Sequence, residues 1–342
     1  MIQFGVTLAR LLVAGALLAL TACGGGGVRV RTDVPEPAVS PPLQRPATGR
    51  LAHLPPQSQP EGLVVDALTH TIAVGVRNPD GVLILDATTL AVRRRLDLAG
   101  APRHLQLARP GVLLVPSEGN DRLSTIDLAS GALTAQFPVG RQPHDAAAAG
   151  GSYYVGDELA DTVHVIGPNG ASTVVVGPRQ PGGVAAGIDG QAVMVVGVRG
   201  RRVEQIDPGG RVVGSAACGV GPTHVRAGPG GLFYVADTQG DAVLVYRAGR
   251  NGPVLVGHVH TGGTPYGLAV DPARHLLYVT LTTTNQLVVL RLSGTSAVIQ
   301  RVVPVSRQPN DVAVDESTGG VIVAGTADGV LDILDAPVGG ER

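Results

Sequence analysis

The stretch "GTPYGLAVDPARHLLYVT", residues 263–280, combines a proline-led turn, an apolar run, a tight reversal and a second apolar run. Short apolar runs separated by turn residues are typical of β-hairpins. Six other segments begin in the same way, with a proline, two variable residues and an apolar or small run. The seven prolines are Pro60, Pro102, Pro143, Pro181, Pro222, Pro265 and Pro309. Their spacings are 42, 41, 38, 41, 43 and 44 residues, and so regular a period predicts a repeat architecture.

Each repeat has room for four short strands. A third apolar run follows the first two, such as "RLSTID" (122–127), and a fourth leads to the next proline, such as "ALTAQFPVG" (132–140). Sheets with apolar residues on both faces need neighbours on both sides, and closure into a ring supplies them. The sequence therefore predicts an all-β, seven-bladed β-propeller over residues 50–337, with a C-terminal tail at 338–342.

The two ends of the repeat array complement each other. The seventh repeat ends at "LDILDAP" (331–337) without a fourth strand, whereas "GRLAHLPP" (49–56) precedes the first proline without a repeat of its own. We expect Leu51 to Leu54 to complete the last blade beside Leu331 to Leu334. An N-terminal strand would then close the ring.

An acidic or amide residue recurs just before the third run of six repeats. Asp and Asn often close turns by bonding their own backbone two residues on, so we expect these residues to close hairpins. They are Asp80, Asp121, Asp161, Asp241, Asn285 and Asp328, with Arg201 at the seventh position.

The segments "AVDP" (269–272), "LYVT" (277–280) and "NQLVV" (285–289) resemble the YVTN-type seven-bladed propeller repeat. The resemblance extends from Pro60 to the C-terminus and is clearest in repeats one, two, six and seven. The fourth repeat departs from it, with three arginines, Arg199, Arg201 and Arg202, in "MVVGVRGRRVEQID" (194–207). Tryptophan is absent from the chain, so WD-type and tryptophan-docked quinoprotein propellers match poorly.

The N-terminal residues have a different composition. Arg10 precedes the apolar run "LLVAGALLALTA" (11–22), which suits a signal peptide and is shorter than a membrane span. The run ends in "LTAC" (20–23), which resembles the bacterial lipobox. We expect residues 1–22 to be a lipoprotein signal peptide and Cys23 to be lipidated. The alternative is an ordinary secreted protein in which Cys23 lies near a cleavage site.

Residues 23–49 contain the lipidated cysteine and a Gly/Pro-rich stretch with few apolar residues, which predicts an extended tether. The expected location is extracytoplasmic, with a lipid anchor in the cell envelope. Because Gly24 follows the cysteine in place of the aspartate that retains lipoproteins at the inner membrane, the anchor would lie in the outer membrane if the bacterium has two.

Charge, cysteine content and the absence of certain motifs argue against several classes of partner and enzyme. The net charge is −1, so the composition gives no electrostatic reason to expect nucleic acid or anionic lipid as a partner. The second cysteine, Cys218, lacks a partner if Cys23 is acylated, and no Cys-x-x-Cys-His motif would attach a haem. No motif for a nucleophilic serine or for phosphate binding occurs.

Polar residues gather where each repeat begins. In a propeller, the loops into the innermost strands and the loops between the second and third strands lie on one face. The positions just after the prolines hold Glu61, Arg103, His104, His144, Asp145, Thr223, His224, Tyr266, Asn310 and Asp311. The neighbouring loops hold Glu118, Asp157, Glu158 and Asp237.

Three interpretations of these residues stay open. Asp145, Asp311 and the histidines would cap turns by bonding backbone amides. Neutral imidazoles with a carboxylate would bind a divalent metal, whereas protonated imidazoles beside Arg103 would bind an anion. We expect adjacent blades to bring His104 and His144 together, with His224 and Asp311 farther round the funnel. The ligand or metal candidates are Glu61, Arg103, His104, His144, Asp145, His224, Asn310 and Asp311.

The sequence supports three hypotheses of function. The first is a cell-envelope lipoprotein that displays a propeller as a ligand-binding or protein-binding module, with the membrane, envelope proteins or a small polar ligand as partners. The second is a metal-dependent hydrolase or lactonase acting at the funnel mouth. "PEG" (60–62) and "PND" (309–311) resemble the metal-holding residues of gluconolactonase-like propellers. The third is a structural surface protein.

Replacing Cys23 by serine removes the thiol that would receive the lipid. Two acyl chains give stable anchoring, so we expect the Cys23→Ser variant to lose the membrane attachment that the lipid provides. Metabolic labelling with a fatty acid and membrane fractionation measure this result. Unchanged labelling and partition in the variant would contradict lipidation.

Overall fold

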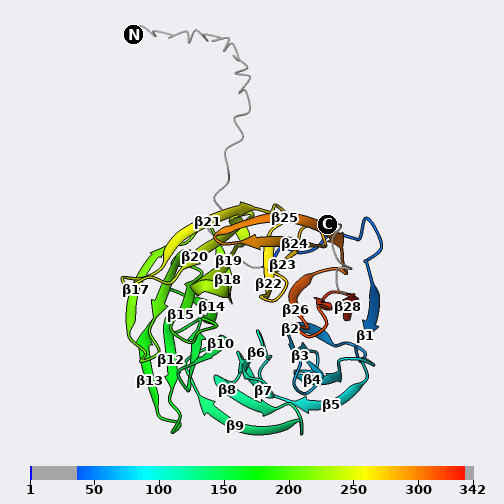
Figure 1. The fold of residues 1–342 in the computed structure, drawn as a ribbon, viewed down its shortest axis with the longest axis horizontal. Coiled ribbons are helices and arrows are strands. Elements are labelled where there is room, and N and C mark those ends of the chain that lie inside the picture. Colours follow the sequence, from blue (N-terminus) through cyan, green and yellow to red (C-terminus); the bar gives the residue numbers. More distant parts are fainter. Residues whose placement is uncertain (2–36, 336–342) are drawn as a thin grey trace. The chain divides into compact units, whose positions relative to one another are not determined.

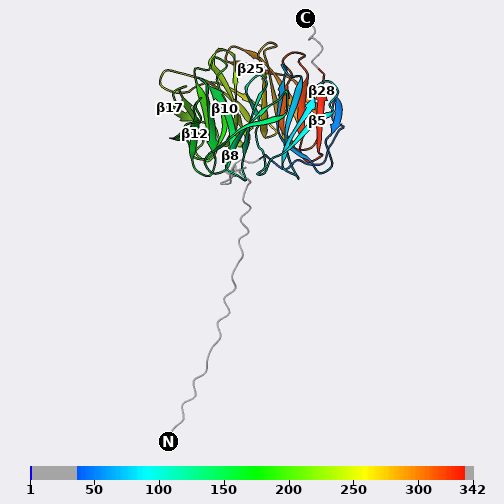
Figure 2. The ribbon, with the colours of Figure 1, turned by 90° about the horizontal axis from the view of Figure 1, so that it is seen from below.

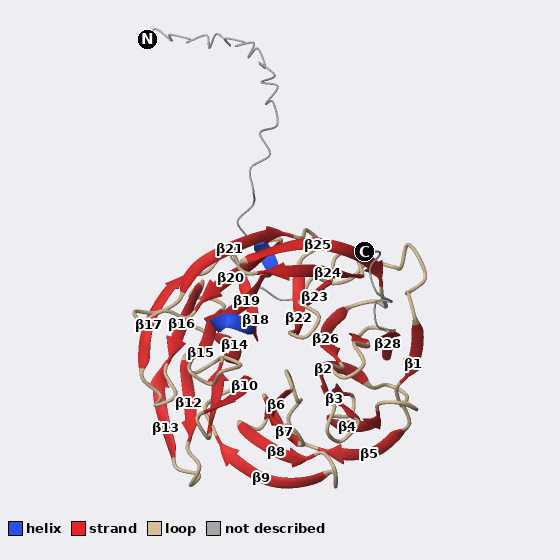
Figure 3. Ribbon diagram, viewed as in Figure 1, coloured by secondary structure: helices blue, strands red, loops and turns tan. Residues whose placement is uncertain are grey.

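The computed structural model describes residues 37–335, together with Met1. Seven four-stranded antiparallel sheets stand around a common axis and form a ring (Figures 1 and 3). The side view in Figure 2 shows the strands running between the two ends of the ring. The all-β, seven-bladed propeller predicted from the repeats is confirmed. The signal peptide, Cys23, the tether up to residue 36 and the tail lie outside the described residues.

Each blade is a meander whose first strand is innermost. Blade one contains β2 (Gln59–Asp66), β3 (Thr71–Arg77), β4 (Gly81–Asp86) and β5 (Val92–Asp97), and blade two contains β6 (Gln106–Arg109), β7 (Val112–Ser117), β8 (Arg122–Asp127) and β9 (Ala132–Pro138). Blade three contains β10 (Pro143–Ala149), β11 (Ser152–Asp157), β12 (Thr162–Ile166) and β13 (Ser172–Val176). Blade four contains β14 (Pro181–Ala186), β15 (Val193–Gly197), β16 (Arg202–Ile206) and β17 (Val212–Ala217).

The remaining blades follow the same order except the last. They contain β18 (Pro222–Gly228), β19 (Leu232–Asp237), β20 (Ala242–Arg247) and β21 (Val254–His260); β22 (Pro265–Asp271), β23 (Leu276–Leu281), β24 (Gln286–Ser293) and β25 (Ser296–Pro304); and β26 (Pro309–Val314), β27 (Val321–Gly325), β28 (Val330–Leu334) and β1 (Arg50–His53). Two short 3-10 turns, η1 (Pro229–Gly231) and η2 (Thr238–Gly240), flank β19. Among the described residues, no helix has the length and apolar character needed to cross a membrane.

The N-terminal strand closes the ring as the sequence predicts. β1 pairs antiparallel with β28, with Arg50 opposite Ile333 and His53 opposite Val330. Leu54 follows the strand and is buried between the last and first blades. The last blade is thus built from both ends of the described chain.

The apolar core lies between the blades. The buried side chains form seven clusters within residues 37–335, and each cluster joins two adjacent blades. Every blade therefore buries both faces, which only a closed ring allows for all of them. Near the axis, where space is smallest, Ala146 and Ala147 are buried in β10.

The recurrent Asp and Asn residues lie in the hairpin turns, as predicted, but the side chains of five of them accept from the neighbouring blade instead of from their own backbone two residues on. The amide N–H of Gln142 donates to Asp121, and that of Gln180 donates to Asp161, at 2.9 and 2.7 Å. The donor in each case is the residue before the proline of the next blade. The same bond joins Ala101 to Asp80, Thr264 to Asp241 and Gln308 to Asn285.

Backbone conformation explains this difference. Asp121, Asp161, Asp241 and Asn285 turn the chain with positive φ values of 52–56°, and Arg201 does the same with φ 50°. The turn therefore does not need an acidic side chain, which leaves the carboxylate available to the next blade. Asp328 is the exception, since it accepts from Arg307 of its own blade.

The end of the expected tether is packed on the ring. Ser40 donates from Oγ to the carbonyl of Thr282 and accepts from the amide of Gln308, at 2.7 and 2.9 Å. Asn285 donates to the carbonyl of Pro41, and the amide of Thr48 donates to the carbonyl of Pro304. Residues 38–48 are thus attached to the last two blades, although their composition led us to expect a free tether up to residue 49.

Deleting residues 50–56 should open the last blade. We expect the free energy of unfolding to fall by about 3–5 kcal/mol, because the ring loses a paired strand and the buried Leu54 side chain. Urea unfolding of the chain from Gly24 onward measures the loss. A second deletion, of residues 24–36, is the control and should leave the midpoint unchanged. Equal midpoints for the two deletions would show that ring stability does not depend on β1.

Candidate functional site

The positions after the prolines are irregular in their pairing. In six innermost strands the register with the second strand shifts directly after the proline, as between Pro143 and Asp145 or between Pro309 and Asp311. A bulge of this kind changes the direction of a side chain, and bulges are common beside active sites. The innermost strands converge on the axis, so these side chains meet across blades.

Three histidines from blades two, three and five meet there. His104, His144 and His224 are 3%, 5% and 3% exposed, and one ring nitrogen of each lies within 4.8 Å of the others. The ring centroid of His104 is 4.9 Å from that of His144 and 4.1 Å from that of His224. Tyr266 of blade six packs edge-on against His224, with centroids 4.3 Å apart.

The approach of His224 differs from the prediction that it lies farther round the funnel. Blade four, between His144 and His224, has Gly182 and Gly183 in the corresponding positions. A Cβ on Gly182 would lie 2.6 Å from Val198 Cγ2, and one on Gly183 would lie 2.9 Å from the Thr223 carbonyl oxygen. Because these two positions carry no side chain, blade five can bring His224 to the other histidines.

Two glutamates lie beside His144. His144 Nδ1 is 2.9 Å from Glu118 Oε1 and 3.5 Å from Glu158 Oε1. Burial raises the pKa of Glu118, but the hydrogen bond from His144 and the charge of Arg103 outweigh burial and hold this pKa at about 2. Burial lowers the pKa of His144, but Glu158 and Glu118 outweigh it, and the pKa is raised. His144 therefore donates from Nδ1 to an ionised carboxylate.

The other two histidines are neutral. Burial, followed by the charges of neighbouring histidines, holds the pKa of His104 and of His224 well below 6.5. His224 Nδ1 lies 3.2 Å from the carbonyl oxygen of Tyr266, to which it can donate, so Nε2 keeps its lone pair. His104 Nε2 is buried and has no hydrogen-bond partner in the described part of the chain. Neutral imidazoles with free lone pairs are the form that ligates metals.

The predicted residues Glu61, Arg103 and Asn310 form the rim of this site. Glu61 accepts from Asn310 at 3.2 Å and pairs with Arg103 at 3.3 Å. Arg103 and Arg77 both pair with Glu118, at 3.3 and 3.1 Å. The charge of Arg103 is thus opposed by two carboxylates, which weakens the anion-binding interpretation.

Arg77 was missed from the sequence. It lies at the end of the second strand of blade one, next to the class of loop that contributes Glu118 and Glu158. Gln142 and Gln180, the residues before two of the prolines, were also missed. Their amide groups donate to Glu158 at 3.1 and 3.3 Å and hold it beside His144.

Asp145 and Asp311 are not part of the histidine cluster. Asp145 accepts from the amide of Val184, and Asp311 accepts from the amide of Leu63, each in the next blade, at 3.1 and 2.9 Å. Arg226 pairs with Asp145 at 3.3 Å. These two aspartates follow the amide-capping interpretation, with the capped amide in the neighbouring blade.

Asp157 and Asp237 are also bound elsewhere. Asp157 contacts His164 Nδ1 at 2.6 Å, and Asp237 accepts from the amides of Val220 and Gly221. The Thr223 hydroxyl lies 2.7 Å from the Thr238 hydroxyl in η2 and 3.4 Å from the carbonyl oxygen of Ala236 in β19. Thr223 also lines the cavity described next.

A small cavity adjoins the histidines. Its volume is about 10 Å³, which suits one water-sized molecule. The lining residues are His144, Glu158, Gly182, Val198, Thr223, His224 and Tyr266.

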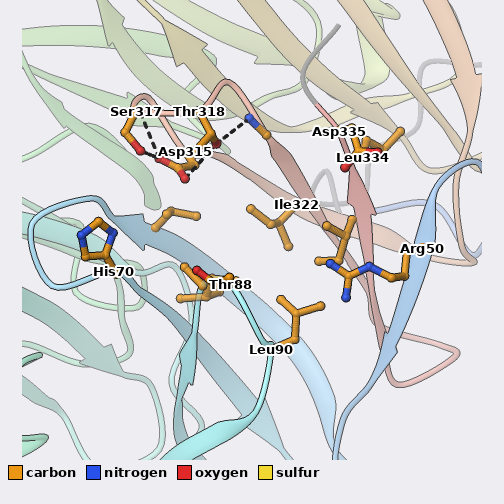
Figure 4. A pocket seen from close by; sticks show the side chains of 15 residues that line it. Arg50, His70, Thr88, Leu90, Asp315, Ser317, Thr318, Ile322, Leu334 and Asp335 are labelled. Carbon is orange, nitrogen blue, oxygen red and sulfur yellow. Dashed lines mark hydrogen bonds between the residues drawn. The ribbon is translucent and has the colours of Figure 1, made fainter. Parts of the chain in front are cut away.

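A larger groove lies on the other end of the ring, between the last and first blades (Figure 4). Its titratable groups are Arg50, His70, Asp315 and Asp335, and Asp315 is already bonded to Ser317 and Thr318. This groove contains no group of three metal-ligating side chains. The histidine cluster is therefore the stronger candidate site.

No protein-family model matches the chain, and no curated protein is similar to it in sequence. Solved structures share its fold. A virginiamycin B lyase from Staphylococcus aureus has a TM-score of 0.70 at 12% identity, over 83% of this chain and 98% of the lyase. The Cps50 (Swd1) β-propeller domain from Myceliophteria thermophila has a TM-score of 0.71 at 13% identity, over 84% and 100%. A Kuenenia stuttgartiensis hydrazine synthase chain has a TM-score of 0.71 at 16% identity, over 84% and 99%.

The fold and the site define the class: a seven-bladed β-propeller protein with a buried histidine cluster at its axis. The shared identities are low, so these likenesses establish the fold alone. Chemistry has to be argued from the residues of this chain.

Asp311 should make stability depend on pH. Burial raises the pKa of Asp311 from 3.8 to about 7. The contribution of the protonated side chain to stability is therefore fully present below pH 3.8 and is lost as pH rises through 7. Asparagine mimics the protonated side chain. We expect the stability of Asp311→Asn relative to the parent to rise by a few kcal/mol between pH 4 and pH 8, roughly 1.4 per unit of pKa shift.

Urea unfolding at several pH values measures this change. The control is Asp315→Asn, because hydrogen bonds from Ser317 and Thr318 lower the pKa of Asp315 against the opposing effect of burial. Asp315 is then ionised in both states above pH 5, and its stability difference should stay constant there. A constant difference for Asp311→Asn as well would contradict the raised pKa.

Proposed function

We propose that this chain is a lipid-anchored extracytoplasmic protein whose propeller binds a divalent transition-metal ion at its axis. The observation that carries the proposal is the convergence of three buried imidazoles, His104, His144 and His224, with ligand nitrogens within 4.8 Å of one another. Tetrahedral zinc with Zn–N bonds of about 2.0–2.1 Å places its ligand nitrogens about 3.4 Å apart. Small side-chain shifts would bring the three nitrogens to that spacing.

The surroundings of the histidines support a metal over a purely structural cluster. Metal-bound histidines usually donate their other ring nitrogen to a carboxylate or a backbone carbonyl. His144 has Glu118 as such a partner, and His224 has the carbonyl of Tyr266. A ligand would also satisfy the buried Nε2 of His104, which otherwise costs the free energy of an unmade hydrogen bond.

A three-histidine set suits zinc, copper, nickel or iron better than magnesium or calcium, which prefer oxygen ligands. The adjoining cavity has room for one water-sized ligand. Binding is therefore the function that the site supports best, on a module displayed at the cell envelope. We propose in addition that the repeats are of the YVTN type, that the lipobox directs lipidation of Cys23, and that the anchor lies in the outer membrane if the bacterium has two membranes.

A metal-dependent hydrolase or lactonase is the second candidate. Glu158 lines the cavity and lies 3.5 Å from His144, where its carboxylate could accept a proton from a ligand in the cavity. A variant of the S. aureus virginiamycin B lyase with one histidine replaced by alanine is described as catalytically inactive, so a propeller histidine can be essential to an enzyme. The small cavity favours binding, since a larger substrate would need the rim to move.

Metal titration tests the site. We expect the chain from Gly24 onward to bind Zn²⁺ saturably at pH 7.5, and His104→Ala/His144→Ala to bind at least about 100-fold more weakly. Binding should weaken as pH falls below neutral, because the raised pKa of His144 lets protons compete there first. Isothermal calorimetry and metal analysis of the purified protein measure both effects.

The matched control is His258→Ala/His260→Ala, which removes two exposed histidines from β21 and should keep full affinity. Equal binding by the parent and His104→Ala/His144→Ala would contradict the site. Binding of acetate that strengthens as pH falls would instead support the anion interpretation.

A further inference from the structure

One end of the ring carries a cluster of exposed arginines, on blades three and four. Arg179 precedes the innermost strand of blade four, and its carbonyl accepts from the amide of Gly200 at 3.2 Å. Gly200 is flanked by Arg199 and Arg201, so the backbone of Arg179 lies beside the segment that carries these two arginines. Arg141 occupies the equivalent position in blade three, where its carbonyl accepts from the amide of Leu159.

The charges of these arginines are not neutralised. Within residues 37–335, no carboxylate forms an ion pair with Arg141, Arg179, Arg199 or Arg201. Arg141, Arg179 and Arg199 are exposed and Arg201 is half-buried. We call these four residues the arginine patch.

The acidic groups on the neighbouring loops form hydrogen bonds with amides. Asp161 accepts from the amide of Gln180 at 2.7 Å, and Glu158 accepts from the side chains of Gln142 and Gln180. Asp121 accepts from the amide of Gln142, next to Arg141, as Asp161 does from that of Gln180, next to Arg179. Both aspartates are exposed and stay charged, so four arginines face two carboxylates and the patch keeps an excess of positive charge.

The N-terminal segment attaches to the same end. Ser40 bonds to the loop between β23 and β24 and to Gln308, which precedes an innermost strand. These are the two classes of loop that also carry the arginine patch. Thirteen residues lie between Cys23 and the first residue of the ring segment, Pro37. A chain of that length spans about 45 Å when extended and about 20 Å on average when flexible.

We propose that the arginine patch docks this end of the ring on an anionic phospholipid surface, so that the histidine site opens toward the membrane. The orientation rests on the proposed lipid anchor, which would hold this end within reach of the bilayer. Charge complementarity selects the lipid, because each basic residue near an anionic surface adds to binding. The net charge of −1 did not predict this patch, because net charge is summed over the whole chain. A membrane surface interacts mainly with charges within a Debye length of about 8–10 Å.

Vesicle binding tests the patch without the lipid anchor. All seven sheets and core clusters lie within residues 37–335, so a chain beginning at Gly24 contains the whole ring. We expect it to cosediment with phosphatidylglycerol-containing vesicles but not with pure phosphatidylcholine vesicles, and to dissociate as salt is raised. Arg141→Glu/Arg179→Glu/Arg199→Glu should bind at least about 100-fold more weakly, roughly 5-fold or more for each arginine.

The control is Arg109→Glu/Arg211→Glu/Arg250→Glu, which makes the same change in net charge on exposed arginines at the other end of the ring. This variant should keep most of the affinity. The milder Arg141→Gln/Arg179→Gln/Arg199→Gln, with circular dichroism on all variants, separates lost docking from lost folding.

Equal losses of vesicle affinity in the two charge-reversal variants would show that net charge, and not the arginine patch, controls binding. Binding that does not depend on phosphatidylglycerol would overturn it as well, and so would binding to a soluble polyanion such as heparin without binding to vesicles. The chain used has no lipid, and its patch variants retain the three histidines. Failure of docking is therefore distinguishable from failure of anchoring or of metal binding, which the Cys23→Ser and His104→Ala/His144→Ala experiments measure.

Discussion

The constraint on which the structure depends is that every blade is apolar on both faces. Seven buried clusters lie between adjacent blades, and the seven blades cannot all bury both faces unless the ring is complete. Closure draws seven innermost strands toward one axis, so side chains more than a hundred residues apart, such as those of His104 and His224, come into contact. The site is thus a consequence of the packing that stabilises the fold.

Convergence of the innermost strands alone would fill the axis with the side chains that follow each proline. Two features make a site of this region. Gly182 and Gly183 leave blade four without side chains where those of its neighbours meet, and the glutamates beside His144 keep its Nδ1 side polar. Burial keeps the other two histidines neutral. The result is one imidazole held by carboxylates and two with lone pairs available, an arrangement compatible with the metal binding that we propose.

The sequence predicted what depends on periodicity and on neighbouring blades. The period of about forty residues identified seven blades, and the missing fourth strand identified β1 as its replacement. The meeting of His104 with His144 followed from their places in adjacent blades. The position of His224 did not, because it depends on how closely blade five can approach past two glycines. The partners of Asp121 and Asp161 were also missed, since a hydrogen bond across blades, 21 or 19 residues away, leaves no local signal.

The N-terminal segment and the histidine site are parts of one polar network. Gln308 donates to the carbonyl of Ala38 at 2.9 Å and to Asn310 at 3.1 Å, and Asn310 in turn donates to Glu61. From there ion pairs continue through Arg103 and Glu118 to the ring of His144. Burial lowers the pKa of His144, but Glu158 and then Glu118, the carboxylate at the end of this network, outweigh burial and raise it. The segment that connects the ring to the expected anchor is therefore joined to the histidines by a continuous series of hydrogen bonds and ion pairs.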